Sequence, residues 1–157
     1  MNTVTHALLP VVAICLYQRF RKSDFSLNKF QYALITFAGA APDLFTPHFS
    51  IASRYSSWSH TLPALITFTV ILLTTASFKF KTLTTKVAVF MVVAYSLHLA
   101  CDALSGGIPW LLPYSDAILG DYYISPSLWI PFDVILVFTT YILARTVKDS
   151  SSATTSV

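Results

Sequence analysis

The sequence predicts an all-α protein, a polytopic transmembrane bundle of about five helices. Of the 157 residues, 55% are hydrophobic and only 11% are charged, whereas about 25% of the residues of a soluble domain carry a charge. A soluble domain of this size buries only a modest fraction of its surface, so it could not remove that much apolar area from water. The apolar residues also form five segments separated by polar stretches, which is typical of a chain that crosses a bilayer repeatedly.

The five apolar segments are the expected helices. They cover residues 5–17, 30–41, 61–78, 86–104 and 128–144. A full span needs roughly 20 residues, with a range of about 17–25. The last three segments reach that length, whereas the first two must draw on flanking residues or lie at a shallow depth. The single membrane-embedded domain is expected over residues 1–147, followed by a polar Ser/Thr-rich tail, 148–157, that is expected to be disordered.

The basic residues indicate the orientation. With five spans, nine of the ten Lys and Arg residues lie at one end of the bundle, and only Arg54 lies at the other. The positive-inside rule then predicts an N-terminus outside and a C-terminus in the cytoplasm of an inner (plasma) membrane. Removing one span would scatter the basic residues over both ends, so the same pattern supports the count of five.

Histidines and acids collect at the opposite end. All four histidines and five of the seven acids lie there: His6, Asp43, His48, His60, His98, Asp102, Asp116, Asp121 and Asp133. Charged groups near the hydrocarbon core are costly and tend to face the bundle interior, where they find partners. Carboxylates grouped without cations repel one another. A divalent ion would remove that repulsion and would take imidazole nitrogen as a further ligand.

The predicted metal ligands are His6, Asp43, His60, His98 and Asp102. His98 and Asp102 are four residues apart, so on a helix they share one face. Carboxylate and imidazole donors suit zinc, manganese or iron, and several histidines favour zinc. A metal with an open position lowers the pKa of a bound water molecule. Asp133 or Asp43 could then serve as the catalytic base, or as a bridge between two metal ions, since these residues could hold one ion or two.

Each of these residues also has a simpler interpretation. His98 and Asp102 can form an ordinary hydrogen bond, and Pro42-Asp43 is typical of a turn. The remaining histidines can be helix caps or interfacial residues. The aromatic segment 105–126 can be either an interfacial belt or a lid that lines the site and meets lipid.

Four motifs, in this order along the chain, carry a family resemblance: Thr5-His6, Ala41-Pro42-Asp43-Leu44, Ser59-His60-Thr61 and His98-Leu99-Ala100-Cys101-Asp102-Ala103-Leu104-Ser105. The chain resembles, from residue 3 to about residue 135, the bacterial inner-membrane metal-dependent hydrolases that are described in part as LexA-binding. That family is distantly similar to zinc phospholipase C and P1-type nucleases. The resemblance therefore implies phosphoester hydrolysis, by analogy.

The chain departs from the family pattern in two motifs. The second acid of the family's Pro-Asp motif falls on Phe45, and its His-Arg-Gly motif falls on Tyr55-Ser56-Ser57. Arg54 and His48 lie nearby but out of register. The site is therefore expected to differ in part from that of the family.

The sequence thus predicts a membrane-bound metal-dependent hydrolase that acts on a phosphoester or lipid-type substrate at the non-cytoplasmic face. Membrane lipid is the expected partner, and the small net charge of +3 gives no indication of nucleic acid binding. One alternative is a non-catalytic membrane protein whose polar cluster is structural or binds an ion. Another is a membrane module that binds a soluble partner through its basic loops.

Overall fold

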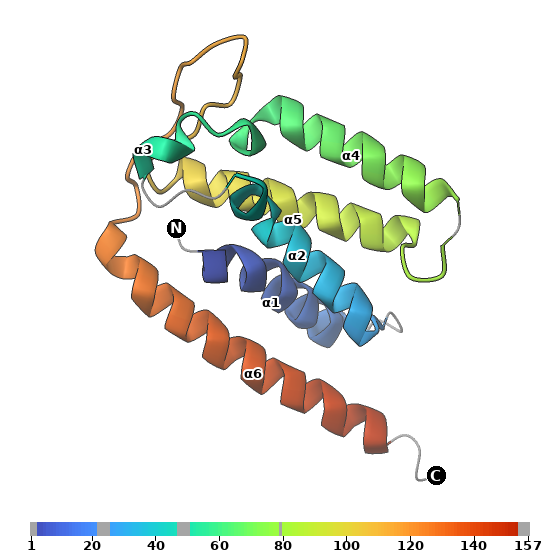
Figure 1. Cartoon of the computed structure of the whole chain (residues 1–157). Helices are drawn as coiled ribbons and strands as arrows, with labels where there is room; N and C mark the ends of the chain where they lie inside the picture. Colours follow the sequence, from blue (N-terminus) through green and yellow to red (C-terminus); the bar gives the residue numbers. More distant parts are fainter. Residues whose placement is uncertain (1–2, 22–25, 47–50, 79, 154–157) are drawn as a thin grey trace.

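The computed structural model describes residues 3–21, 26–46, 51–78 and 80–153. In these residues the fold is all-α, and five long helices follow the five apolar segments (Figure 1). They are α1 Thr3–Arg21, α2 Lys29–Phe45, α4 Leu62–Ser77, α5 Thr85–Ala103 and α6 Trp129–Ala153. A short helix, α3 Ile51–Arg54, and a 3₁₀ turn, η1 Trp58–His60, connect α2 to α4.

The helix lengths revise which segments can span a bilayer. Three helices are long and apolar enough to do so, over Thr3–Phe20, Thr85–Ala103 and Pro126–Arg145. The third apolar segment was predicted to be a full span, but α4 has only 16 residues, because Thr61 and Phe78 at the two ends of the segment are capping residues outside the helix. The first segment is longer than predicted, since its polar flanks continue the helix.

Helix α6 also extends past the predicted end of the domain at residue 147. It continues to Ala153, and the domain boundary at residue 147 with its disordered tail stays a prediction. No Gly or Pro interrupts the chain from Phe132 to Ala153, and a helix that has started continues until such a residue or a cap ends it. Residues 154–157 lie outside the described part of the chain.

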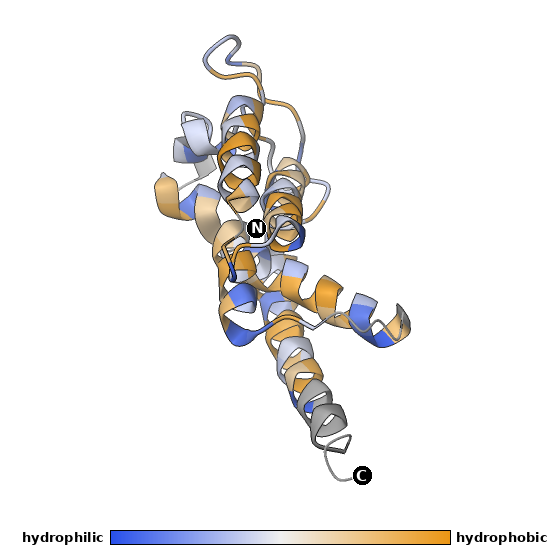
Figure 2. Ribbon diagram, turned by 90° about the vertical axis from the view of Figure 1, so that its right-hand side faces the viewer, coloured by the Kyte–Doolittle hydropathy of each residue, from blue (hydrophilic) through white to orange (hydrophobic). Residues whose placement is uncertain are grey.

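The helices pack around α2 and α5. Helix α2 contacts both α1 and α5, α4 packs against α5, and α6 packs against α1. The core between α2, α4 and α5 is built from small and branched residues, among them Ile35, Ala38, Val87 and Ala94. Hydrophobic residues run along the long helices (Figure 2). Many of those on α6, such as Ile130 and Phe138, remain exposed and are suited to contact lipid.

The chain reversals place one set of helix ends together. The start of α1, the end of α2, the start of α4, the end of α5 and the start of α6 lie at one end of the bundle (Figure 1). We call this the site end. The opposite end, here the basic end, carries the exposed side chains of Arg19, Lys29, Lys81, Lys86 and Arg145. The predicted separation of acids and histidines from basic residues is thus present in the fold, and which end faces the cytoplasm stays a prediction.

The segment between α5 and α6 folds over the site end as an irregular loop (Figure 1). Two isolated bridges, Ser105 with Tyr122 and Ile108 with Leu119, hold its two limbs together. Ile108 is fully buried against α5, whereas Tyr114 and Tyr123 are 86% and 73% exposed. The base of the loop therefore covers part of the bundle, while Tyr114 near its tip and Tyr123 beside the basal bridge are exposed.

Candidate metal centre

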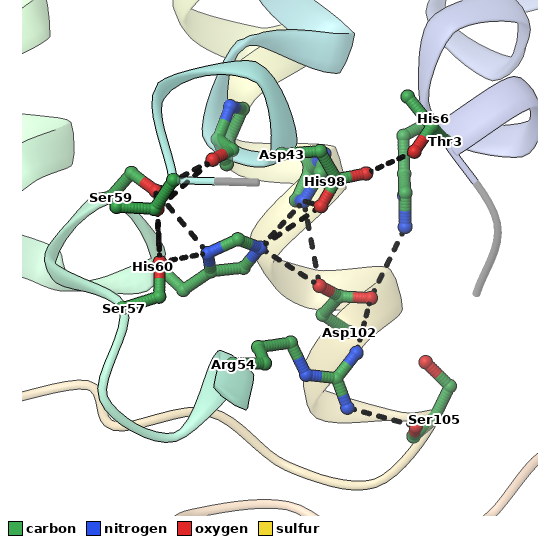
Figure 3. A network of polar contacts seen from close by, with 12 residues as sticks. Thr3, His6, Asp43, Arg54, Ser57, Ser59, His60, His98, Asp102 and Ser105 are labelled. Carbon is green, nitrogen blue, oxygen red and sulfur yellow. Dashed lines mark hydrogen bonds and ion pairs between the residues drawn. The ribbon is translucent and has the colours of Figure 1, made fainter. Parts of the chain in front are cut away.

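Four side chains from three elements converge at the site end. Asp43 comes from the last turn of α2, His60 from η1, and His98 and Asp102 from α5 (Figure 3). One nitrogen or oxygen atom from each lies within 4.8 Å of all the others. We call these atoms the four-donor cluster. They include four of the five predicted metal ligands.

The spacing of the cluster matches a tetrahedral metal site. His60 Nε2 lies 3.1 Å from His98 Nε2, and 3.3 Å from both Asp43 Oδ1 and Asp102 Oδ2. His98 Nε2 lies 3.5 Å from Asp43 Oδ1 and 3.4 Å from Asp102 Oδ2. A tetrahedral zinc ion with nitrogen and oxygen ligands at about 2.0–2.1 Å would separate its ligand atoms by roughly 3.3 Å. Five of the six separations in the cluster are therefore those that an ion at its centre would require.

The outer nitrogen atoms of both imidazoles are hydrogen-bonded. His98 Nδ1 lies 2.7 Å from the backbone oxygen of Gly39, and because a carbonyl only accepts, Nδ1 must carry the proton. A neutral His98 then directs the lone pair of Nε2 into the cluster. His60 Nδ1 lies 2.7 Å from Ser57 Oγ, which can accept in the same way. If both Nδ1 atoms carry the proton, the Nε2 lone pairs of His60 and His98 face each other at 3.1 Å, and a cation between them would remove their repulsion.

Burial distinguishes Asp43 from the other three ligands. The side chains of His60, His98 and Asp102 are at most 1% exposed, whereas that of Asp43 is 13% exposed. The second oxygen of Asp43 accepts a hydrogen bond of 2.6 Å from Thr3 at the start of α1. Asp43 therefore forms the edge of the cluster that lies nearest to the exterior.

Local packing explains how these elements meet. Gly39 allows α1 and α2 to approach closely, since a Cβ there would lie 2.3 Å from the backbone oxygen of His6. The hydroxyl of Tyr95 on α5 donates to the backbone oxygen of Ser59 and holds η1 against α5. The hydroxyl of Ser59 donates in turn to the backbone oxygen of Pro42. Pro42 and Asp43 lie inside α2, so the interpretation of this dipeptide as a turn is wrong.

His6, the fifth predicted metal ligand, lies beside the cluster and not among its four donors. Its Nε2 is 3.2 Å from Asp102 Oδ1, the oxygen that does not belong to the cluster. Its ring lies over that of His98, with 3.9 Å between the centroids. It is buried, and its Nδ1 has no hydrogen-bond partner in the described part of the chain. His6 therefore contacts a ligand residue, and a direct role as a ligand stays a prediction.

Of the other predicted residues at the site end, Asp133 lies outside the four-donor cluster and His48 lies outside the described residues. Asp133, the other predicted catalytic residue, accepts a hydrogen bond of 2.5 Å from the hydroxyl of Thr5. This contact ties α6 to α1 next to His6, and Asp133 is not one of the four donors.

Arg54 is the residue that sequence reasoning missed. The site end was expected to lack a cation inside the polar cluster, yet Arg54 is only 2% exposed and its Nη1 lies 2.8 Å from Asp102 Oδ1. Helix α3 and the turn that follows bring it there, although it is out of register with the basic motif of the family. One signal was present, because Arg54 is the single basic residue on the acidic side of the chain.

Comparison with known families gives a match over nearly the whole chain. The model of the YdjM inner membrane protein family matches residues 1–155. The chain belongs to the YdjM inner membrane protein family. Comparison with curated proteins and with solved structures finds no match.

Membership in the YdjM family confirms the predicted location in the inner membrane, in agreement with the three helices able to span it. The four-donor cluster then lies in an inner membrane protein, near the ends of α2 and α5 and at the start of α4. The name of the YdjM family describes a location and no reaction, so the chemistry has to be inferred from the cluster.

Proposed function

We propose that this YdjM family protein is a membrane-bound metal-dependent hydrolase, and that Asp43, His60, His98 and Asp102 hold the metal ion. The observation that carries the proposal is the spacing of the four donors, 3.1 to 3.5 Å in the five measured pairs. Two neutral imidazoles and two carboxylates are a donor set that zinc accepts readily, and manganese or iron would also accept it.

When bound, such an ion supplies a Lewis acid and lowers the pKa of a water molecule that it binds. Asp43 is the ligand best placed to admit water, because it is the most exposed of the four and borders the exterior. It could also accept a proton from that water. Asp133, held by Thr5 beside His6, is the second candidate for the base.

The charge of the loaded site favours an anionic substrate. Asp43 and Asp102 bring two negative charges, while Arg54 and a divalent ion together bring three positive ones. A buried site with one excess positive charge attracts a phosphoester or another anion. Lipid headgroups present such groups at the membrane surface, where the helix ends of the site lie. These considerations agree with the phosphoester or lipid-type substrate implied by the family resemblance, on the non-cytoplasmic face.

A non-catalytic metal site is the main alternative. Structural zinc sites have four protein ligands, whereas catalytic sites have three and one water molecule. The cluster already offers four donors, which favours a structural or ion-binding role. In the hydrolase, the ion would have to expand to five ligands or lose the carboxylate of Asp43.

A partner-binding module is the second alternative. The exposed basic end offers a surface for an acidic partner. The family that the sequence resembles is described in part as LexA-binding, and binding of that kind would require this surface to face the cytoplasm. This function would not depend on the four-donor cluster, so it can be tested separately.

Metal analysis of the purified protein in detergent tests the proposal first. Mass spectrometry should find bound zinc, manganese or iron in the unmodified protein and much less in the His98→Ala variant. The matched control is Asp116→Asn, which changes an exposed carboxylate at the site end of the bundle. This variant should keep its metal. Substoichiometric metal that His98→Ala leaves unchanged would refute a metal centre.

Hydrolysis is then measured on two probes. These are bis(p-nitrophenyl) phosphate in solution, and vesicles of phosphatidylethanolamine and phosphatidylglycerol from which headgroup release is followed. Turnover that Asp43→Asn abolishes and Asp116→Asn preserves supports the hydrolase. Tight metal binding without turnover of either probe favours the structural site instead.

A further inference from the structure

The two oxygen atoms of Asp102 face different groups. Oδ2 belongs to the four-donor cluster, 3.3 Å from His60 Nε2 and 3.4 Å from His98 Nε2. Oδ1 lies 2.8 Å from Arg54 Nη1 and 3.2 Å from His6 Nε2 (Figure 3). One carboxylate thus joins the proposed metal position to a guanidinium group.

Arg54 is firmly held in this position. Its Nη2 donates to the backbone oxygen of Ser105 at 3.1 Å, and the guanidinium is almost completely buried. The adjacent hydroxyl of Tyr55 donates to the backbone oxygen of Gly106 at 2.8 Å. A Cβ on Gly106 would lie 3.0 Å from Arg54 Nη2, so the glycine leaves room for the guanidinium. The contacts of two consecutive residues therefore fasten Arg54 to the end of α5.

We propose that Arg54 occupies the position that a second metal ion would need, so that the centre holds one ion. This inference rests on the proposed metal centre. In sites with two metals, the ions lie about 3.5–4 Å apart, close enough for one carboxylate to contact both. Asp102 has the orientation of such a bridging ligand, but a guanidinium fills the place on its Oδ1 side.

His6 supports the same assignment. Its Nε2 approaches Asp102 Oδ1, the atom that Arg54 binds, and its ring is fully buried. Asp102 Oδ1 and His6 Nε2 would be the first two ligands of a second ion. Arg54 contacts one of them directly, and its positive charge repels any cation that approaches the other. Arg54 is thus a positioning residue that fixes the number of metals, and His6 orients Asp102 instead of binding the ion.

Metal stoichiometry tests the inference. The purified protein is saturated with Zn²⁺, separated from free metal, and analysed by mass spectrometry. The unmodified protein should bind one ion per chain, and Arg54→Ala should bind two. Arg54→Lys, which keeps the positive charge, should bind one. Arg19→Ala removes an exposed arginine at the basic end and serves as the matched control, again with one ion.

A second readout identifies the additional site. With Mn²⁺ in place of Zn²⁺, the unmodified protein should give the paramagnetic resonance spectrum of an isolated ion. Arg54→Ala should give that of a coupled pair. The double variant His6→Ala, Arg54→Ala should return to one isolated ion, because it lacks a ligand of the second position.

The outcomes separate this inference from the proposed function. No metal in the unmodified protein would overturn both. Two ions in the unmodified protein, or one ion in a folded Arg54→Ala protein, would overturn the inference and leave the metal centre intact. If Arg54→Ala does not fold, the metal content of the single variant His6→Ala tests the inference instead. It should keep one ion, whereas complete loss of metal would make His6 a ligand of that ion and overturn the assignment.

Discussion

The two ends of the helical bundle carry charged groups of opposite sign, which are exposed at one end and buried at the other. At the basic end, side chains such as Lys29, Lys81 and Arg145 are exposed. At the site end, His60, His98 and Asp102 are at most 1% exposed and point toward one another. Exposed charges stay solvated and contribute little to stability, whereas buried ones require partners. The same fold thus leaves charged side chains in contact with solvent at one end and buries them among partners at the other.

The largest expected effect is the loss of a proposed metal ligand at the site end. His98→Ala removes one donor and the hydrogen bond to Gly39, so metal affinity should fall by more than about 100-fold, beyond the usual effect of changing an outer partner. Competition with a chelator measures it. Lys29→Gln at the basic end should change the affinity by less than about twofold, because its charge is solvated. Equal effects of the two changes would remove the distinction between the ends.

Gly39→Ala should be the next most damaging change. The added Cβ would lie 2.3 Å from the backbone oxygen of His6, so α1 and α2 must separate. Overpacking of this kind costs about 1–3 kcal/mol, and the shift would also displace the carbonyl that orients His98. The thermal unfolding temperature and the metal affinity should both fall. The control is Ala33→Ser on the exposed face of α2, and a similar result for both variants would argue against a close helix contact.

A smaller effect is expected from Ser57→Ala. Ser57 Oγ lies 2.7 Å from His60 Nδ1, and removing it leaves the imidazole without its main orienting partner. Changes to such partners lower metal affinity by about 10–100-fold. The folded state should survive, which circular dichroism can verify. Ser56→Ala, which removes a hydroxyl that donates to the nearby backbone oxygen of Ser53, is the control. An unchanged affinity in Ser57→Ala would show that Ser57 does not orient His60.

The smallest effect on metal binding is expected from substitutions that test the orientation of the two ends in the membrane. Cysteines placed singly at Asp116 and at Lys81 replace exposed residues at opposite ends. An impermeant thiol reagent added to intact cells should label the first and not the second, since the basic end is expected to be cytoplasmic. Neither substitution should alter metal binding by more than about twofold, given the distance over which salt screens charges. Labelling of both sites from the same side would contradict the predicted topology.

Much of the site could be predicted because its members lie at the ends of apolar segments. The spacing of His98 and Asp102 was sufficient to place them on one face of α5, and both belong to the four-donor cluster. Asp43 and His60 were assigned to the same end by counting helices. Their approach to within 3.3 Å depends on the turn η1 and on contacts from Tyr95 and Ser59, which no spacing in the sequence reveals.

The amino-acid sequence alone was enough to predict the membrane class, the five helices and the separation of acids from basic residues. These properties follow from composition and from the order of apolar segments, which act locally. Only the tertiary structure decided that Arg54 enters the acidic cluster, that His6 faces the outer oxygen of Asp102, and that α4 has only 16 residues. The first two depend on contacts between residues far apart in the chain, Arg54 with Asp102 and His6 with Asp102, which no local pattern reveals. The length of α4 depends on the capping residues at its two ends, Thr61 and Phe78.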